Sequence, residues 1–201
     1  TLERLERAFA PVGMVGVVVG HPEWLEEMKR SVAGILQVGW IWCEGGMSRQ
    51  ESVLKGLLRL PESCRRVFIH DAARCCLDMA WLGEMERGSR NLSGQGRIPV
   101  YDLADSVVRV REGQVAGYER RSDLRLVQTP QCFPFPEILS AHLRAKDVPG
   151  MTDDGSVWLM DGGVLLTVPG HPDNRKLTRP EDRRLMEEWL LLHPLDRRRF
   201  D

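Results

Sequence analysis

The sequence predicts an α/β fold of the Rossmann-like kind, a mostly parallel sheet flanked by helices, with a protruding β-hairpin arm. Residues 14–20 form a continuous Val-rich run, typical of a strand covered on both faces. Such runs alternate along the chain with stretches of helical periodicity. Between residues 105 and 131 this rhythm stops and Val alternates with Arg or Glu, which predicts a two-stranded arm.

The elements follow one another in a regular order. Apolar residues recur at helical spacing from residue 2, and Ser48 with Glu51 forms a capping box before another apolar stripe. Thr178 and Pro180 introduce the last helix. The predicted strands cover residues 14–20, 38–46, 67–69, 97–104 and 164–168, and the predicted helices cover 1–9, 21–36, 48–60, 77–87, a segment from 135, a segment after 154, and 181–192.

The arm has a turn signal at its centre, the pair Glu112-Gly113. An isolated hairpin is marginally stable in water, so we expect the arm to lie against a second subunit. We therefore predict one domain over residues 1–201, with residues 105–131 as a β-arm subregion.

Composition excludes several classes of function. The 201 residues include 28 basic and 29 acidic ones, so the chain has no net positive charge that would favour binding to nucleic acid or to an anionic membrane. No apolar run approaches the ~18 residues of a membrane span. Five cysteines without a CxxC pair favour reduced thiols in the cytoplasm over a disulfide framework or a zinc site.

Polar residues follow the short apolar run 67–69 directly. His70, Asp71 and Arg74 come next, with only alanines between them. Open α/β sheets bind ligands beyond the carboxyl ends of their strands, so these residues indicate a ligand site. The alternative is a polar turn, with Asp71 capping the next helix and Arg74 as its ion-pair partner.

Six motifs occur in a characteristic order along the chain. They are GGMSRQESVLKGL (45–57), HDAAR (70–74), DS (105–106), QTPQCF (128–133), TDD (152–154) and DNRKLTRPEDRRLME (173–187). Together they closely resemble the 2-C-methyl-D-erythritol 4-phosphate cytidylyltransferase family. The resemblance implies transfer of CMP from CTP to methylerythritol phosphate with release of pyrophosphate. It also implies Mg²⁺ held mainly by the CTP phosphates, with no protein metal ligand assigned, and a homodimer joined through the arm.

The resemblance assigns the nucleotide pocket to Gly46, Met47, Ser52 and Ala72. A glycine pair before a capped helix suits this role, because the backbone can approach a base or phosphate closely and the helix N-terminus favours negative charge. Taken alone, these residues would equally form an ordinary strand–helix turn.

The acceptor side is assigned to Asp71, Arg121, Thr129 and Thr152. Asp71 would accept hydrogen bonds from erythritol hydroxyls, and the two threonines would hold the substrate phosphate. Arg121 would reach that phosphate from the neighbouring subunit, and a guanidinium fork suits a phosphate. Without the resemblance, Arg121 would be interpreted as one charged residue among several on a solvent-exposed arm.

For other polar residues of these motifs, the sequence allows both ligand binding and a structural role. Arg74 could belong to the ligand site or could stabilise the local structure. Thr152 could cap the following helix, and Asp153 and Asp154 suit either ligand binding or the dipole of that helix.

Lys176 is the strongest single candidate, one of only four lysines beside 24 arginines. The resemblance places it in contact with both ligands, with Lys176 and Arg121 as the catalytic pair. The alternative is an edge lysine facing water.

The chain begins inside a helix at Thr1, so we expect a preceding segment with the family's first strand and glycine-rich loop. A chain truly starting at Thr1 would instead favour a non-catalytic nucleotide-binding dimerisation domain. Ribitol-5-phosphate cytidylyltransferase, which shares the fold and several motifs, is the closer alternative.

Overall fold

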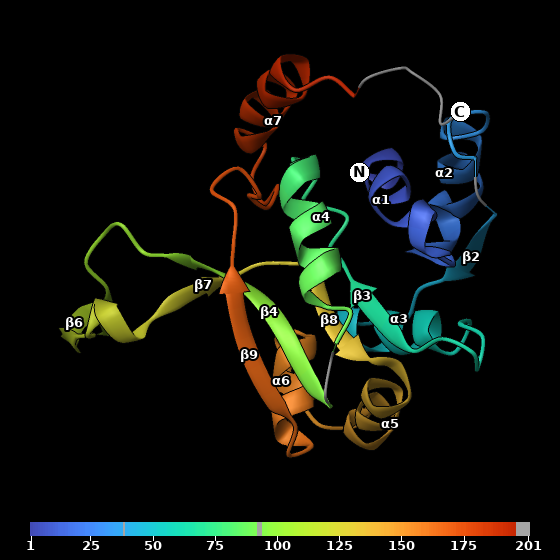
Figure 1. Cartoon of the computed structure of the whole chain (residues 1–201). Coiled ribbons are helices and arrows are strands. Elements are labelled where there is room, and N and C mark those ends of the chain that lie inside the picture. Colours follow the sequence, from blue (N-terminus) through green and yellow to red (C-terminus); the bar gives the residue numbers. More distant parts are fainter. Residues whose placement is uncertain (38, 92–93, 196–201) are drawn as a thin grey trace.

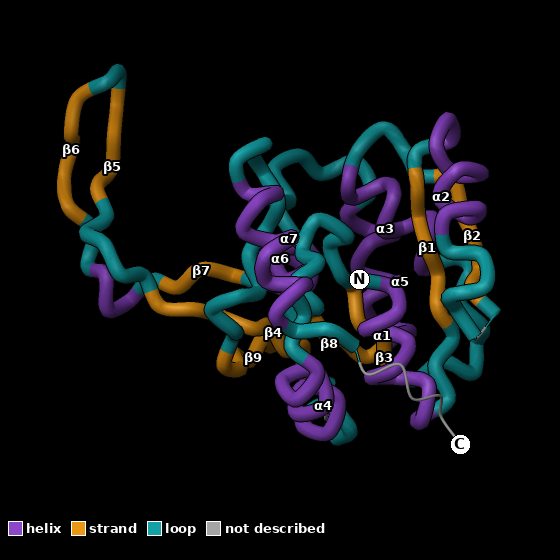
Figure 2. Tube along the Cα trace, turned by 90° about the horizontal axis from the view of Figure 1, so that it is seen from above, coloured by secondary structure: helices purple, strands orange, loops and turns teal. Residues whose placement is uncertain are grey.

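The fold is built around a five-stranded sheet with helices on both faces (Figure 1). The structure is a computed structural model and describes residues 1–37, 39–91 and 94–195. Helix α4 (Met79–Gly88) covers one face, and α5 (Phe135–Ala145) and α6 (Asp154–Met160) cover the other (Figure 2). The predicted α/β class is confirmed. No helix within the described ranges has the length and apolar character needed to cross a bilayer.

The other elements follow the predicted order. The remaining α-helices are α1 (Leu2–Phe9), α2 (Leu25–Ser31), α3 (Arg49–Leu57) and α7 (Asp182–Leu192). The strands are β1 (Gly16–Gly20), β2 (Trp40–Glu44), β3 (Arg66–Ile69), β4 (Gln95–Asp102), β5 (Val108–Arg111), β6 (Gln114–Tyr118), β7 (Arg125–Val127), β8 (Gln131–Pro134) and β9 (Val164–Pro169). Short 3₁₀ turns occupy Ala10–Val12, Pro22–Trp24 and Arg121–Asp123.

The large sheet is mixed. Its order is β3-β8-β4-β7, and β9 pairs with residues 95–100 of β4. Strands β4 and β9 run parallel, whereas β8 runs antiparallel to both β3 and β4. Because β8 opposes β3, the end of β3 and the start of β8 lie at the same edge, with Ile69 opposite Gln131. This edge is where the candidate site forms.

The hairpin turn is confirmed. Glu112 has φ 50° and Gly113 has φ 79°, the left-handed conformations that a tight two-residue hairpin turn requires. Figures 1 and 2 both show β5 and β6 projecting from the body of the molecule. Only residues 108–118 form this free hairpin, because β7 pairs with β4 and Gln131 with β3 in the main sheet. The arm is therefore shorter than the predicted range 105–131.

The main core lies between the large sheet and helices α3, α5 and α6. Phe133 and Ile138 are fully buried at its centre, and Trp158 packs on Phe133 with ring centroids 5.5 Å apart. Burying side chains of this size is worth about 1.5–3 kcal/mol each. The core therefore packs α3 and α6 against the large sheet.

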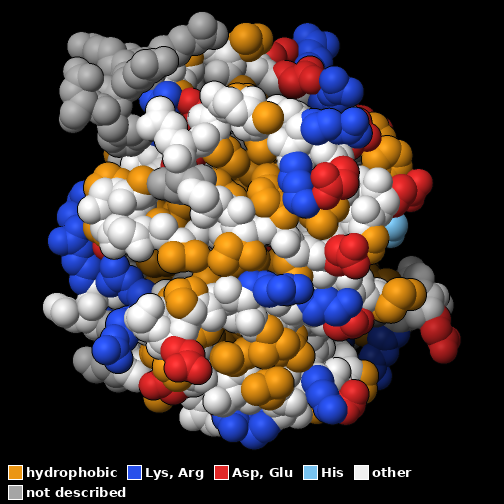
Figure 3. All heavy atoms as spheres, turned by 90° about the vertical axis from the view of Figure 1, so that its right-hand side faces the viewer, with side chains coloured by type: hydrophobic (Ala, Val, Ile, Leu, Met, Phe, Trp, Pro, Cys, Tyr) orange, Lys and Arg blue, Asp and Glu red, His pale blue; other side chains and the backbone are white. Residues whose placement is uncertain are grey.

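Strands β1 and β2 form a separate parallel pair. Among the described residues they hydrogen-bond to each other and to no other strand. Helix α3 packs on β1 at Gly56, where an added Cβ would lie 2.7 Å from Val19 Cγ2. Figure 3 views this side of the molecule and shows hydrophobic side chains exposed between charged ones. Within β2 only Cys43 is buried, so the described residues cover the β1–β2 pair only in part.

Candidate active site

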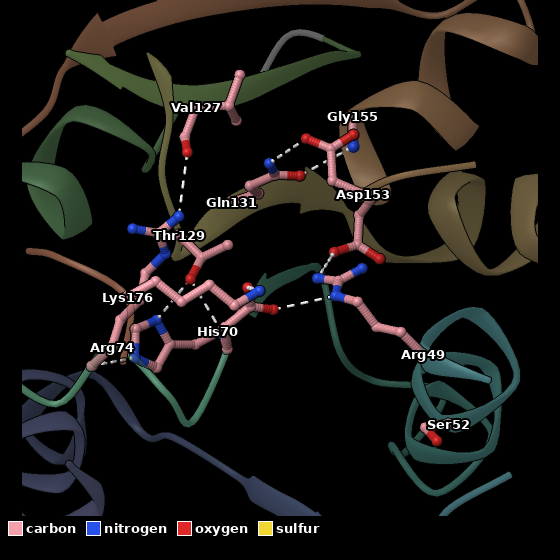
Figure 4. Close-up of polar contacts among 12 residues, drawn as sticks. Arg49, Ser52, His70, Arg74, Val127, Thr129, Gln131, Asp153, Gly155 and Lys176 are labelled. Carbon is pink, nitrogen blue, oxygen red and sulfur yellow. Dashed lines mark hydrogen bonds and ion pairs between the residues drawn. The ribbon is translucent and has the colours of Figure 1, made fainter. Parts of the chain in front are cut away.

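The loop after β3 is held against the start of β8. The backbone N–H of Asp71 donates to Thr129 Oγ1 at 3.0 Å, and the same hydroxyl lies 3.0 Å from His70 Nδ1 (Figure 4). The other ring nitrogen of His70 lies 3.0 Å from the carbonyl oxygen of Arg74. Burial lowers the pKa of His70 to about 4, so its ring is neutral at pH 7. His70 and Thr129 thus fix the backbone that carries Asp71.

Asp71 joins two cations at the edge of the sheet. Its Oδ2 accepts from Lys176 Nζ at 2.9 Å, and its Oδ1 accepts from Arg49 Nε at 3.0 Å (Figure 4). Burial alone would raise the pKa of Asp71, but the hydrogen bonds and charges of Lys176 and Arg49 outweigh it and lower that pKa below its ordinary value. Asp71 is therefore a carboxylate at neutral pH.

Arg49 also reaches into the interior. Its Nη2 donates to Asp154 Oδ2 at 2.8 Å, and His142 Nε2 lies 3.2 Å from the other oxygen of Asp154. Asp154 is completely buried. Burial opposes the charge on Arg49, but the two carboxylates outweigh it and raise the pKa of Arg49. The guanidinium is therefore a permanent cation between two anions.

The predicted nucleotide turn lies between β2 and α3. Ser48 Oγ accepts from the N–H of Glu51 at 3.1 Å, which confirms the predicted N-cap. The carboxylate of Glu51 accepts from the N–H of Met47, at 2.7 Å, and not from Ser48 as a capping box requires. Ser52 Oγ accepts from the N–H of Gly46 at 2.9 Å. Three of the predicted nucleotide residues, Gly46, Met47 and Ser52, thus form one compact turn.

Arg74 has a structural role. It donates to the carbonyl oxygens of Asn174 at 2.9 Å and Val127 at 3.1 Å. It makes no ion pair with Asp71 in the described part of the chain, and helix α4 is capped by Asp78 instead. The alternative in which Asp71 caps a helix and pairs with Arg74 is therefore wrong. Arg74 ties the segment that carries Lys176 to the loop after β3.

The two carboxylates of the TDD motif have different partners. Asp153 caps α6 by accepting from the N–H of Ser156 at 2.8 Å, and it also accepts from the amide of Gln131 at 2.7 Å. Asp154 pairs with Arg49, as described above. Both carboxylates thus have protein partners at the N-terminal end of α6, Asp153 as its cap and Asp154 in its first turn.

The remaining predicted residues differ in position. Ala72 and Thr152 are exposed near this edge of the sheet, whereas Thr129 is buried, with its hydroxyl engaged by Asp71 and His70. Arg121 is exposed on the segment between β6 and β7, where it donates to the carbonyl oxygen of Ala104. That segment lies on the projecting side of the molecule in Figure 1, away from β3. One chain therefore assembles Asp71 and Lys176 but leaves Arg121 apart.

Arg49 is not among the residues that the sequence predicts for the site, although it lies inside the motif at residues 45–57. A cation in the first turn of a helix is disfavoured by the helix dipole. Its position just after the cap residue Ser48 is therefore a weak signal that favours a carboxylate nearby. Nothing local in the sequence identifies Asp71 and Asp154 as the partners.

Comparison with known proteins decides the family. Residues 6–191 match the model of the 2-C-methyl-D-erythritol 4-phosphate cytidylyltransferase family. The chain belongs to this family. A Synechococcus protein of the same name is 32% identical over 181 residues, which cover 89% of this chain and 77% of the relative.

Several other relatives are named as bifunctional enzymes. A bifunctional enzyme IspD/IspF from Solidesulfovibrio magneticus is 37% identical over 174 residues, or 83% of this chain, and the match spans only 42% of that relative's length. The fold agrees with solved structures. A crystal structure of 4-diphosphocytidyl-2C-methyl-D-erythritol synthase superimposes with a TM-score of 0.78 at 29% identity, covering 94% of this chain and 89% of the other. The cytidylyltransferase from Thermus thermophilus gives 0.73 at 27% identity, with 93% and 86% covered.

Proposed function

We propose that this chain transfers CMP from CTP to 2-C-methyl-D-erythritol 4-phosphate and releases pyrophosphate. The observation that carries the proposal is the 2.9 Å contact between Lys176 Nζ and Asp71 Oδ2 at the end of β3. It brings together a cation for phosphates and a carboxylate for hydroxyl groups, from motifs 105 positions apart. Family membership supports the same reaction.

The reaction needs two anions to meet. An oxygen of the acceptor phosphate forms a bond to the α-phosphorus of CTP, and the bond from that phosphorus to the bridging oxygen breaks as pyrophosphate leaves. Catalysis of this kind depends mostly on positioning and charge neutralisation. Lys176 would lie between the two phosphates, and Asp71 would accept hydrogen bonds from the acceptor's hydroxyl groups.

The nucleotide side is proposed at the turn before α3. The almost fully exposed Met47 side chain, 98% accessible, can cover the face of a base. Gly46 allows the side chain of Glu51 to pack against the turn, in the space that a Cβ would fill. Ser52 holds the turn in shape, and Ala72 is exposed beside Asp71. The positive end of the α3 dipole adds attraction for phosphate.

Mg²⁺ is proposed as the cofactor, held by CTP. No cluster of three or more His, Cys, Asp or Glu residues in the described ranges could hold a metal, and Asp71 and Asp154 are already paired with Arg49. Mg²⁺ commonly binds through substrate phosphates and keeps several waters, and the proposal assigns it to the CTP phosphates for that reason. The ion would neutralise charge on the triphosphate. EDTA is expected to abolish turnover, and excess Mg²⁺ to restore it.

A homodimer is proposed through the arm. Val108, Val110, Val115 and Tyr118 are exposed on the free hairpin, and such apolar side chains gain stability when another surface covers them. An arm that lies against a second copy can carry Arg121 toward the partner's acceptor phosphate. Thr152 would contact the same phosphate, and Thr129 would support Asp71 from beneath. The five free cysteines favour a reducing compartment such as the cytoplasm.

The test is an assay of the purified full-length polypeptide with CTP and Mg²⁺. We expect pyrophosphate release with methylerythritol phosphate and formation of the CDP-linked product, detected by chromatography. Ribitol 5-phosphate serves as the competing acceptor. A clear preference for ribitol 5-phosphate, or no pyrophosphate with either acceptor, would overturn the proposal.

A further inference from the structure

Five side chains of alternating character run from the exposed edge of the sheet into the core. They are Lys176, Asp71, Arg49, Asp154 and His142, and each contacts the next at 2.8–3.2 Å. Lys176 is 43% exposed at one end, whereas Asp154 and His142 are buried at the other. The outer end of this row carries the proposed chemistry, and the inner end is fixed by the core.

The inner end is a strong anchor. Asp154 lies in the first turn of α6, where the helix dipole favours a carboxylate. Its Oδ2 bonds to Arg49 Nη2, which provides the charged partner that a completely buried carboxylate requires. Moving Arg49 away would therefore leave the buried carboxylate of Asp154 without a charged partner.

The outer contact uses a different atom of the same planar group. Arg49 Nε donates to Asp71 Oδ1, while Nη2 is held by Asp154. Because Nε and Nη2 belong to one rigid guanidinium, fixing one direction fixes the other. Asp71 Oδ1 is thus held, and Oδ2 is directed to Lys176. A lysine at position 49 has one nitrogen and no fixed plane.

We propose that Arg49 is a positioning residue of the transfer reaction, which uses the buried Asp154 to orient Asp71 and, through it, Lys176. Arg49 does this from within the protein, as a fixed support for the two groups that would contact the ligands. This inference rests on the proposed function and adds to it a role for the motifs that contain Arg49 and Asp154.

The test compares Arg49→Lys with Arg144→Lys. Arg144 also donates from Nε and an Nη to one carboxylate, Asp161, but this pair lies at the surface, at the C-terminal ends of α5 and α6. We expect Arg49→Lys to lower kcat by ~10²-fold, since small misplacements of catalytic groups cost about that much. KM for CTP should stay within about twofold, whereas Arg144→Lys should leave both constants unchanged.

A double-mutant cycle separates positioning from a general structural effect. If Arg49 acts through Asp71, Arg49→Lys should cost little further activity in an Asp71→Asn background. Equal losses of kcat in the two backgrounds, or a KM effect without a kcat effect, would overturn the inference.

A second readout does not depend on activity. The pKa of the Asp71 carboxyl, followed by NMR, should rise in Arg49→Lys and stay constant in Arg144→Lys. An unchanged Asp71 pKa would refute the inference even if the enzyme were inactive. An inactive wild-type protein with the expected pKa change would refute only the proposed function.

Discussion

Lys176→Ala is expected to separate turnover from stability. The substitution removes the Nζ atom that lies 2.9 Å from Asp71 Oδ2, and it leaves Asp71 paired with Arg49. The lysine side chain is 43% exposed, so the lost ion pair is screened by solvent. An exposed pair contributes about 0–1 kcal/mol to the free energy of unfolding. For a chain of this size that is a Tm decrease of at most about 2–4 °C.

The expected effect on turnover is much larger. Losing one well-placed electrostatic contact to a transition state typically costs ~10²–10³-fold in rate. Lys176→Arg should recover only part of this loss, because a planar fork does not reproduce a compact ammonium between two phosphates. The two losses therefore differ enough to be told apart in one set of experiments.

Lys146→Ala is the matched control. Lys146 follows helix α5, its side chain is 64% exposed, and its nearest carboxylate is Asp147 at 3.9 Å. We expect this variant to keep wild-type kcat and Tm. Steady-state pyrophosphate release and thermal unfolding should be measured for all three variants. Near-normal kcat in Lys176→Ala would show that Lys176 is only a solvated edge residue and would refute its assigned role.

Further predictions concern acid stability, packing and assembly. With its pKa lowered to about 4 by burial, folded His70 stays neutral while the unfolded chain binds a proton below pH 6.5. The free energy of unfolding should therefore fall by about 2 kcal/mol from pH 7.5 to pH 5. His70→Asn should remove that loss in urea titrations, and equal pH dependence in both proteins would contradict the reasoning. Gly56→Ala should destabilise by ~1–3 kcal/mol, because its Cβ would lie 2.7 Å from Val19. Gly117→Ala, whose Cβ meets open space, is the control, and equal melting of the two would be evidence against this packing. Replacing residues 108–118 by a two-residue turn should give a monomer in sedimentation, and a wild-type protein that is itself monomeric at micromolar concentration would rule out the dimer.

Local features of this protein could be predicted from the sequence. The hairpin turn at Glu112-Gly113 and the cap at Ser48 depend on residues within four positions of each other, and both are present. The predicted helices and strands have counterparts near their predicted ranges, because periodicity expresses which face of an element will be buried. Strands β7 and β8, which form antiparallel pairs in the main sheet, were not predicted. The ordered motifs identified the family, which the comparisons confirmed.

The tertiary structure decided which distant groups meet. Antiparallel pairing of β8 with β3 places Thr129 under Asp71, and this pairing depends on how the chain returns from the hairpin. Arg49 finds its partners 22 and 105 positions away, since packing of α3 and α6 on one sheet face brings their first turns together. Sequence spacing carries no information on such contacts. The sequence determined which residues are present for the chemistry, and packing determined that Arg49, and not Arg74, pairs with Asp71.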